Sequence, residues 1–460
     1  MSAAVPSVSV GAAPKGRSDG ARAVFIVVLG IFALSAAMNA LRKDVRVGFD
    51  ELAHISYVAE LQRNEQFWPR IDGFRLLEPS QFRFTDRPNY LNHPGIYYWI
   101  LARLCSPIEG HPESALMLRA CNVLLASIGF AALMALGLAL KLGRFEAYAY
   151  CLPIFGIPVL APIAGSMSND NLAFAGGCVA LLAAQRVVAT ARSSWFLALL
   201  AGMALAGLAK FTALILVGAM TAGVAGLLML RGRFRPWWIL LALAAGFLVA
   251  APYLVFLAQY GQPAPDIPGA AAFFKCPACM FEDVPSAFAG FNRIAAVKRA
   301  DPDNGWRYAP RLSFPAFAGA FVAKFFLEWA PTDLNGSSLQ FALLALPIAA
   351  ALCGLAGLWV SARRLLRGED DATDGTIVAG WLAIMLTFAC HLIFSYKHHL
   401  DFAYVADAWP RLYLPLLAVV ALAGASLLSA ARDARLRPGL AGFLIVGPVI
   451  VGLLGSSLTI

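Results

Sequence analysis

The feature that most constrains this chain is a series of apolar runs, each about 20 residues long, the length that a helix needs to cross a bilayer. Hydrophobic residues make up 60% of the chain and charged residues only 14%, whereas soluble domains have about 25% charged residues. We therefore predict an all-α polytopic membrane protein with about 11 transmembrane helices. The predicted spans are 23–41, 116–140, 146–164, 171–190, 194–208, 210–230, 237–258, 338–361, 376–396, 411–431 and 438–457.

The same pattern predicts a single domain. Residues 1–20 are rich in Ala, Ser and Gly and are predicted to be a disordered cytoplasmic N-terminus. Residues 21–460 are predicted to form one membrane domain. The first run could alternatively be a cleaved signal peptide, since small residues lie at Ser35–Ala40, but its length favours an uncleaved anchor.

The distribution of positive charge predicts the orientation in the membrane. The formal net charge is +9, but Lys and Arg cluster in short linkers between apolar runs, so we expect no nucleic-acid partner. A shorter apolar piece, 94–107, is bounded by Pro94 and Pro107. If it crossed the bilayer, the basic clusters in the middle of the chain would face outward. We therefore interpret it as an interfacial or re-entrant helix.

This orientation predicts a protein of the bacterial inner (plasma) membrane, with a cytoplasmic N-terminus and a site on the periplasmic, extracytoplasmic face. Two long polar segments, 42–115 and 259–337, then face outward, joined by shorter turns at 165–170 and 397–410. We expect the first to carry interfacial helices and catalytic residues, and the second to select the substrate. In the second, Cys276 and Cys279 favour a disulfide over a metal site with only two ligands.

The first outer segment contains an acidic pair, Asp50 and Glu51, followed one helical turn later by His54. Residues three and four apart share a helix face, so the carboxylates and the imidazole are expected to converge at the membrane surface. A positioned carboxylate can act as a general base. The alternative is that Asp50 only caps the helix. Further along, His93 forms a polar corner with Pro94 before an aromatic-rich interfacial helix.

Cationic side chains are predicted at the same outer boundary. Lys210 lies between two apolar runs, where a buried lysine costs about 3 kcal/mol, so it either snorkels or is functional. A basic cluster at Lys397, His398 and His399 is either solvated or binds the substrate, and Arg411 opens a late span. Asp170 stands in a short turn, where capping of the next span is the alternative to binding a substrate or a metal.

Six different motifs follow one another along the chain: Asp50-Glu51-x-x-His54, His93-Pro94-x-x-Tyr97-Tyr98, Leu118-Arg119, Ser168-Asn169-Asp170, Ala209-Lys210-Phe211-Thr212 and Trp409-Pro410-Arg411-Leu412-Tyr413-Leu414-Pro415. This order resembles the C-type (GT-C) membrane glycosyltransferases that use polyprenyl-phosphate sugars, including protein mannosyltransferase-like and aminoarabinose-transferase-like enzymes. The resemblance does not extend in detail to 259–337. Pro94-Gly95 departs from the Pro-Pro that such families often show, which leaves the substrate subgroup open.

The resemblance implies an inverting sugar transfer to a glycan, lipid or protein acceptor at the outer face of the lipid bilayer. Asp50 would be the catalytic base or would position the acceptor, with Glu51 and His54 in support. The substrate-binding candidates are His93, Asp170, Lys210, Lys397, His398, Arg411 and Tyr413, of which Lys210 and Arg411 would meet the donor phosphate. Oxygen ligands from Asp50, Glu51 and Asp170 would suit Mg²⁺ or Mn²⁺ if an ion is bound.

Two other classes remain open. A secondary transporter would explain many helices and a few membrane charges, but it predicts repeated halves and broken helices near the midplane. The sequence has no evident internal repeat, and the polar candidates gather at the outer surface. A non-catalytic envelope-assembly protein would share the architecture while making Asp50 replaceable.

Overall fold

The protein is described here by a computed structural model of residues 16–46, 50–64, 70–265, 311–327, 338–368, 371–402, 408–430 and six further positions between 438 and 445. The predictions for residues 1–15, for Cys276 and Cys279, and for most of the last span lie outside these described residues. The elements are α1 (Gly16–Arg42), α2 (Glu51–Asn64), β1 (Arg75–Leu77), β2 (Phe84–Pro88), α3 (Ile96–Leu104), α4 (Ser114–Ala139), α5 (Arg144–Phe155), α6 (Leu160–Ala164), α7 (Asp170–Thr190), α8 (Ser193–Ala209), α9 (Phe211–Leu230), α10 (Trp238–Tyr260), α14 (Phe314–Leu327), α15 (Ser338–Arg367), α16 (Ala372–Phe402), η3 (Pro410–Leu416) and α17 (Ala418–Ala430).

Long apolar helices dominate the fold, which confirms an all-α polytopic membrane protein. Among the described residues, seven helices are long and apolar enough to cross a membrane, or eight if η3 and α17, which meet at a bend of 61°, form one span. The predicted number of about 11 is therefore not confirmed by the described residues. The predicted span 146–164 is divided into α5 and α6 at residues 156–159, which contain Gly156 and Pro158. The predicted span 194–208 forms α8, which has only 17 residues.

The start of the first helix differs from the prediction. Helix α1 begins at Gly16, so residues 16–20, predicted to be disordered, are helical. Asp19 lies in the first turn of α1, where a carboxylate interacts favourably with the positive end of the helix dipole. The helix of the first apolar run therefore includes residues 16–20, which composition alone had assigned to the disordered N-terminus.

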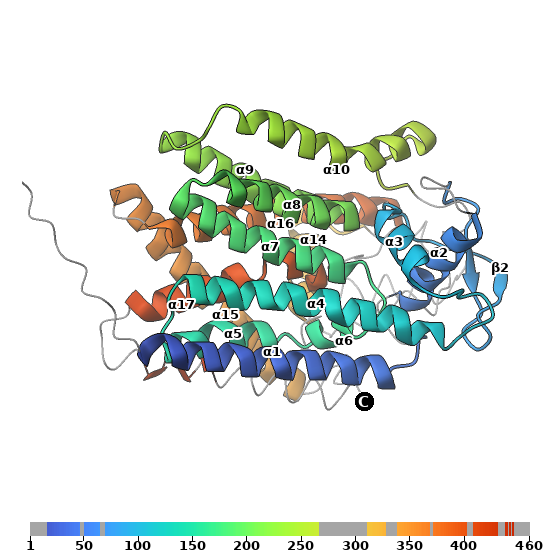
Figure 1. Cartoon of the computed structure of the whole chain (residues 1–460), viewed down its shortest axis with the longest axis horizontal. Helices are drawn as coiled ribbons and strands as arrows, with labels where there is room; N and C mark the ends of the chain where they lie inside the picture. The colour runs from blue at the N-terminus through green and yellow to red at the C-terminus, as the bar shows by residue number, and fades with distance from the viewer. Residues whose placement is uncertain are drawn as a thin grey trace, which may run out of the picture.

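The first outer segment folds into a small layer at one end of the bundle. Figure 1 shows α2, α3 and β2 gathered at the end of the bundle where α1 ends and α4 begins. Strands β1 and β2 form an antiparallel pair. Helix α3 has nine residues, about 14 Å at the usual rise, which is too short to cross a bilayer. The interpretation of 94–107 as a non-spanning piece is thus consistent with the structure.

Small residues let three helices approach closely behind this layer. A Cβ atom added at Gly176 of α7 would lie 2.5 Å from the backbone N of Ala206, and one at Gly202 of α8 would lie 2.6 Å from that of Ala180. Gly177 packs in the same way against Pro415 of η3. Small residues at helix contacts are how membrane helices pack without a hydrophobic driving force between them. This packing brings the first residue of α7, the last turn of α8 and the 3-10 helix η3 to one end of the bundle.

Candidate functional site

Asp50 accepts hydrogen bonds from two distant parts of the chain. Its Oδ1 accepts from the hydroxyl of Tyr90 at 2.8 Å, and its Oδ2 accepts from Nη2 of Arg411 at 3.0 Å. The backbone carbonyl of Asp50 accepts from the N–H of His54, which starts α2. Among the described residues, no backbone N–H of α2 donates to the carboxylate of Asp50, whose partners are Tyr90 and Arg411. Asp50 faces Arg411 rather than serving as a side-chain cap.

The charge of Asp50 depends on these partners. Burial raises the pKa of the Asp50 carboxyl, but the nearby charge of Arg411 and the hydrogen bonds from Tyr90 and Arg411 oppose this effect, and the pKa is lowered on balance. The net pKa lies below the usual range, so Asp50 is ionised at neutral pH. Its side chain keeps 37% of its surface exposed, and solvent or a ligand can therefore reach the carboxylate.

A second carboxylate and cation form a pair at the start of α7. Lys210 Nζ donates to Oδ1 of Asp170 at 2.7 Å, and the Ser168 hydroxyl lies 3.3 Å from Oδ2. Lys210 is the one residue between α8 and α9, and the amide of Asn169 ties this junction down by donating to the carbonyl of Ala209. Neither side of the ion pair is widely exposed. Lys210, which the sequence places between two apolar runs, is thus paired with the Asp170 carboxylate.

The two pairs belong to one cluster around two histidines. Burial lowers the pKa of His54 to about 4, and the charges of Asp50, Asp170, Lys210 and Arg411 all act on it as well. The ring of His93 lies parallel to that of His54, with centroids 6.0 Å apart, and burial lowers its pKa well below 6.5. Both imidazoles are therefore neutral at pH 7. His54 Nδ1 is hydrogen-bonded to the hydroxyl of Tyr98 at 2.8 Å.

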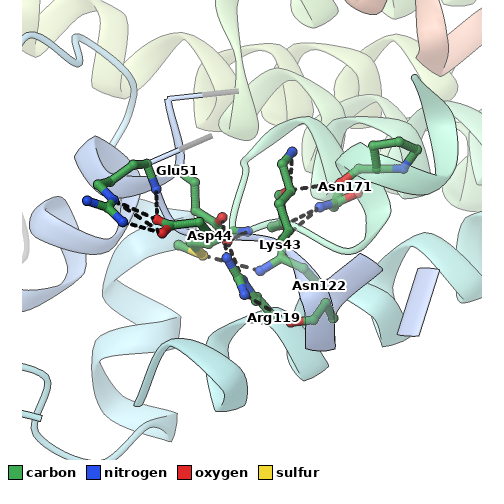
Figure 2. Close-up of polar contacts among 11 residues, drawn as sticks. Lys43, Asp44, Glu51, Arg119, Asn122 and Asn171 are labelled. Atoms are coloured by element: carbon green, nitrogen blue, oxygen red, sulfur yellow. Dashed lines mark hydrogen bonds and ion pairs between the residues drawn. The ribbon is translucent and has the colours of Figure 1, made fainter. Parts of the chain in front are cut away.

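Glu51 has a different environment from its neighbour Asp50. Arg119 of α4 binds it through two parallel hydrogen bonds, Nε to Oε1 at 2.8 Å and Nη2 to Oε2 at 2.7 Å. The backbone N–H of Met167 also donates to Oε1 at 2.8 Å. The Glu51 side chain has no exposed surface. Figure 2 shows this pair together with Lys43, Asn122 and Asn171.

Three predicted residues are not brought into contact with these carboxylates. Lys397 is exposed near the end of α16, and the predicted polar turn there is helical up to Phe402. Within the described part of the chain, no hydrogen bond or ion pair joins Lys397 or His398 to Asp50 or Asp170. Tyr413 is buried in η3, and its hydroxyl lies 3.1 Å from Nδ1 of His391.

Other contacts of the site were not predicted from the sequence. Tyr90 donates to Asp50, and the indole of Trp409 lies beneath Arg411, whose Cζ is 5.2 Å from the ring centroid. Lys324 Nζ also lies 5.7 Å from the centroid of the Trp409 ring. Lys43 donates to the hydroxyl of Ser166 at 3.2 Å, and burial lowers its pKa to about 8. Aromatic and basic residues near a membrane surface are too common for sequence alone to single these out.

The candidate metal ligands are each bound to a cation. Asp50 is paired with Arg411, Glu51 with Arg119 and Asp170 with Lys210. Among the residues that the structure describes, no group of three or more His, Cys, Asp or Glu side chains is placed to hold a metal ion. A metal ion at these carboxylates would therefore have to compete with the protein cations that they already bind.

Comparisons with known proteins give few matches. No protein-family model matches the chain, and no curated protein matches it. Two solved structures do, both crystal structures of ArnT from Cupriavidus metallidurans. The one bound to undecaprenyl phosphate has 15% identity and a TM-score of 0.37, covering 81% of this chain and 77% of that chain. The apo structure has 15% identity and a TM-score of 0.36, covering 92% and 78%. Likeness at this level does not identify a function, which has to be inferred from the site of this chain.

Proposed function

We propose that this chain is a membrane glycosyltransferase that moves a sugar from a polyprenyl-phosphate carrier to a glycan, lipid or protein acceptor on the extracytoplasmic face. The proposal is supported chiefly by the two carboxylate–cation pairs, Asp50–Arg411 and Asp170–Lys210, which come from four separate segments and meet at one end of the bundle. The sequence motifs that resemble C-type glycosyltransferases contain these four residues.

The proposed reaction is an inverting displacement at the anomeric carbon. An acceptor hydroxyl forms the new bond to that carbon while the bond from the carbon to the phosphate oxygen breaks on the opposite face. The electron pair of the broken bond leaves with the polyprenyl phosphate, and the hydroxyl proton passes to Asp50. A positioned carboxylate that accepts this proton contributes about 10²–10⁴-fold in rate.

The leaving phosphate needs positive charge rather than a proton. Arg411 and Lys210 can supply this charge, because guanidinium and ammonium groups stabilise phosphate oxygens at the point where charge develops. In the unliganded site, Arg411 keeps the pKa of Asp50 low, which makes the carboxylate a weak base. A phosphate that binds Arg411 would weaken this hold and raise the basicity of Asp50. Donor binding would thus prepare the base for the acceptor.

The neutral histidines fit the same scheme. His54 is fixed by Tyr98 and stacked on His93, so it can support Asp50 without adding a second positive charge near it. His93 is partly exposed and can offer a ring nitrogen to a sugar or acceptor hydroxyl. Both roles require imidazoles that stay uncharged at neutral pH, in keeping with their lowered pKa values.

The proposal is tested with purified protein in detergent, labelled polyprenyl-phosphate sugars and candidate acceptors. Wild-type protein is expected to release polyprenyl phosphate, and Asp50→Asn to reduce the rate by about 10²-fold or more. Asp86→Asn is the matched control, since Asp86 is an exposed carboxylate of the same outer segment and should leave the rate unchanged.

Two outcomes would reject the proposal. An Asp50→Asn variant that releases polyprenyl phosphate at the wild-type rate would show that this carboxylate has no part in the chemistry. Uptake of a solute into liposomes, with no bond cleavage for any donor, would identify a transporter instead.

A further inference from the structure

We infer that the buried Glu51–Arg119 pair is a positioning device that sets the places of both site carboxylates, Asp50 and Asp170. The inference rests on the proposed function for its catalytic consequence. The structural link itself can be tested without any assay of sugar transfer. Neither Glu51 nor Arg119 is placed to touch a substrate, because their side chains are 0% and 7% exposed.

The Glu51–Arg119 pair is held in one geometry by several hydrogen bonds. The guanidinium of Arg119 donates to both carboxylate oxygens of Glu51 in a fork, and its Nη1 donates to the carbonyl of Ala40 at 2.9 Å. Bidentate arginine–carboxylate pairs fix both distance and orientation. Since Ala40 lies in the last turns of α1, Arg119 of α4 holds the end of α1 and the start of α2 together.

Glu51 also holds the turn before α7. Its Oε1 accepts the backbone N–H of Met167 at 2.8 Å, three positions before Asp170. Asp50 is the residue directly before Glu51. The Glu51 carboxylate therefore links the segment that carries Asp50 to the segment that carries Asp170. These segments are far apart in the sequence, since Glu51 and Met167 are separated by 116 positions.

The backbone φ angle of Asp50 is 59°, in the left-handed region, which costs a residue with a side chain on the order of 1–3 kcal/mol unless the surroundings impose it. The carbonyl of Asp50 is engaged by the N–H of His54, and the next side chain is fixed by Arg119 and Met167. These contacts can impose the left-handed conformation, which directs the Asp50 side chain toward Arg411.

The side-chain amides of Asn122 and Asn171 also hold the turn before α7. Asn171 Nδ2 donates to the carbonyls of Ile163 and Ser166 and to Oδ1 of Asn122, and Asn122 also accepts from the hydroxyl of Tyr97. Figure 2 shows Asn122 and Asn171 beside Arg119 and Glu51. The turn at 165–169 is thus held from α4 and α3 as well as from α2.

The energetics favour a positioning role over a purely stabilising one. When two charges are buried, the free energy lost by removing them from water is about as large as the free energy gained from their attraction. Apolar residues of similar volume therefore often give equal or greater stability. A buried ion pair does, however, tolerate only one geometry. That property suits a site whose carboxylates must be placed within fractions of an ångström of the reacting atoms, since a misplacement of about 1 Å can cost about 10²-fold in rate.

The test uses the full-length protein in detergent with the double variant Glu51→Met/Arg119→Met, which removes both charges and leaves neither one unpaired. Arg119→Lys, which keeps the charge but loses the fork, is the conservative variant. The matched control is Asp44→Asn/Arg46→Met, which removes an exposed ion pair in the same outer segment, with exposed fractions of 42% and 68%. Hydrogen exchange at 50–61 and 166–173, kcat and the KM for the donor are measured for each.

In the double variant, amide exchange is expected to rise about 10-fold or more in both segments together, and kcat to fall by at least about 10-fold. The KM for the donor should change by less than about 3-fold, because Arg411 and Lys210 lie on elements that the pair does not hold. Arg119→Lys should give intermediate values of exchange and kcat. The control should match the wild type in all three.

The inference is overturned if the double variant folds and exchanges like the wild type in either segment, or if kcat per folded molecule is unchanged. Exchange that rises together in both segments of a protein with no transfer activity at all would reject the proposed function while supporting the structural link. The two failures are therefore distinguishable.

Discussion

Asp50 and Glu51 are adjacent in the sequence and carry the same charge, yet the fold places them in opposite environments. The Glu51 side chain is fully buried, with both oxygens occupied by Arg119 and one also by Met167. The Asp50 side chain is 37% exposed, and its cation, Arg411, is 16% exposed. An acidic pair in a sequence can thus divide into one carboxylate that organises the site and one that is accessible to a substrate.

The two ion pairs also differ in how readily they can exchange partners. Removing Arg119 from Glu51 would leave a charge in a place that water cannot reach, so that pair is permanent. Arg411 can leave Asp50 for a phosphate, because the Asp50 side chain is 37% exposed, so that water or a ligand can replace the lost partner. The following predictions test this contrast, in order of decreasing effect.

The largest expected effect is on stability. Arg119→Met should lower the free energy of unfolding by about 3–5 kcal/mol, because it leaves the buried charge of Glu51 uncompensated. Arg411→Met should lower it by less, about 1–3 kcal/mol, because the Asp50 side chain that loses its partner is 37% exposed and water can hydrate its charge. Thermal and denaturant unfolding of the two variants in the same detergent measures the difference. An equal decrease in the free energy of unfolding for both variants would contradict the difference between a buried Glu51–Arg119 pair and a partly exposed Asp50–Arg411 pair.

A smaller effect is expected from pH. Burial lowers the pKa of His54 from 6.5 to about 4, although the charge of Asp50 opposes this shift. Between these values the unfolded chain binds more protons than the folded one, so stability is full above about pH 6.5 and falls as pH drops toward about 4.

Melting temperatures measured from pH 7 to pH 4.5 report this dependence. His54→Gln should weaken it, whereas His111→Gln should not, because the His111 side chain is 56% exposed. A wild-type melting temperature that does not change with pH, or an equal response of the two variants, would show that His54 is not buried in its neutral form.

The smallest expected effect is that of metal removal. Asp50, Glu51 and Asp170 each already have a protein cation. An added chelator should therefore change the rate of polyprenyl phosphate release by less than about 2-fold, a free-energy difference below about 1 kcal/mol. A loss of activity on chelation that Mg²⁺ or Mn²⁺ restores would mean that an ion displaces Lys210 or Arg411 in the working enzyme.

The sequence predicted the class of fold because its apolar runs are long and frequent. It did not predict where one apolar run breaks, since counting apolar length passed over Gly156 and Pro158, which lie between α5 and α6. Helix α8 is likewise shorter than a typical span at 17 residues. Length and composition therefore set the architecture, but prolines and turns inside apolar runs decide how many helices cross.

The candidate site was predictable in its residues but not in its pairing. Asp50, Lys210 and Arg411 stood out as charges at predicted membrane boundaries. That Asp170 meets Lys210 depends on the close packing of α7 and α8 at Gly176 and Gly202, a contact between segments that no local pattern encodes. The partner of Glu51 could not be predicted either, because Arg119 lies 68 positions away on another helix.

Binding of the lipid phosphate tests the central claim most directly. Undecaprenyl phosphate should bind the wild-type protein, and Arg411→Met and Lys210→Met should each weaken binding by about 10-fold or more, since each removes a charge-assisted contact worth about 1.5–3 kcal/mol. Arg46→Met, which removes an exposed arginine of the same outer segment, should leave the Kd unchanged. Equal affinity in all four proteins would contradict the assignment of this cluster as the phosphate site.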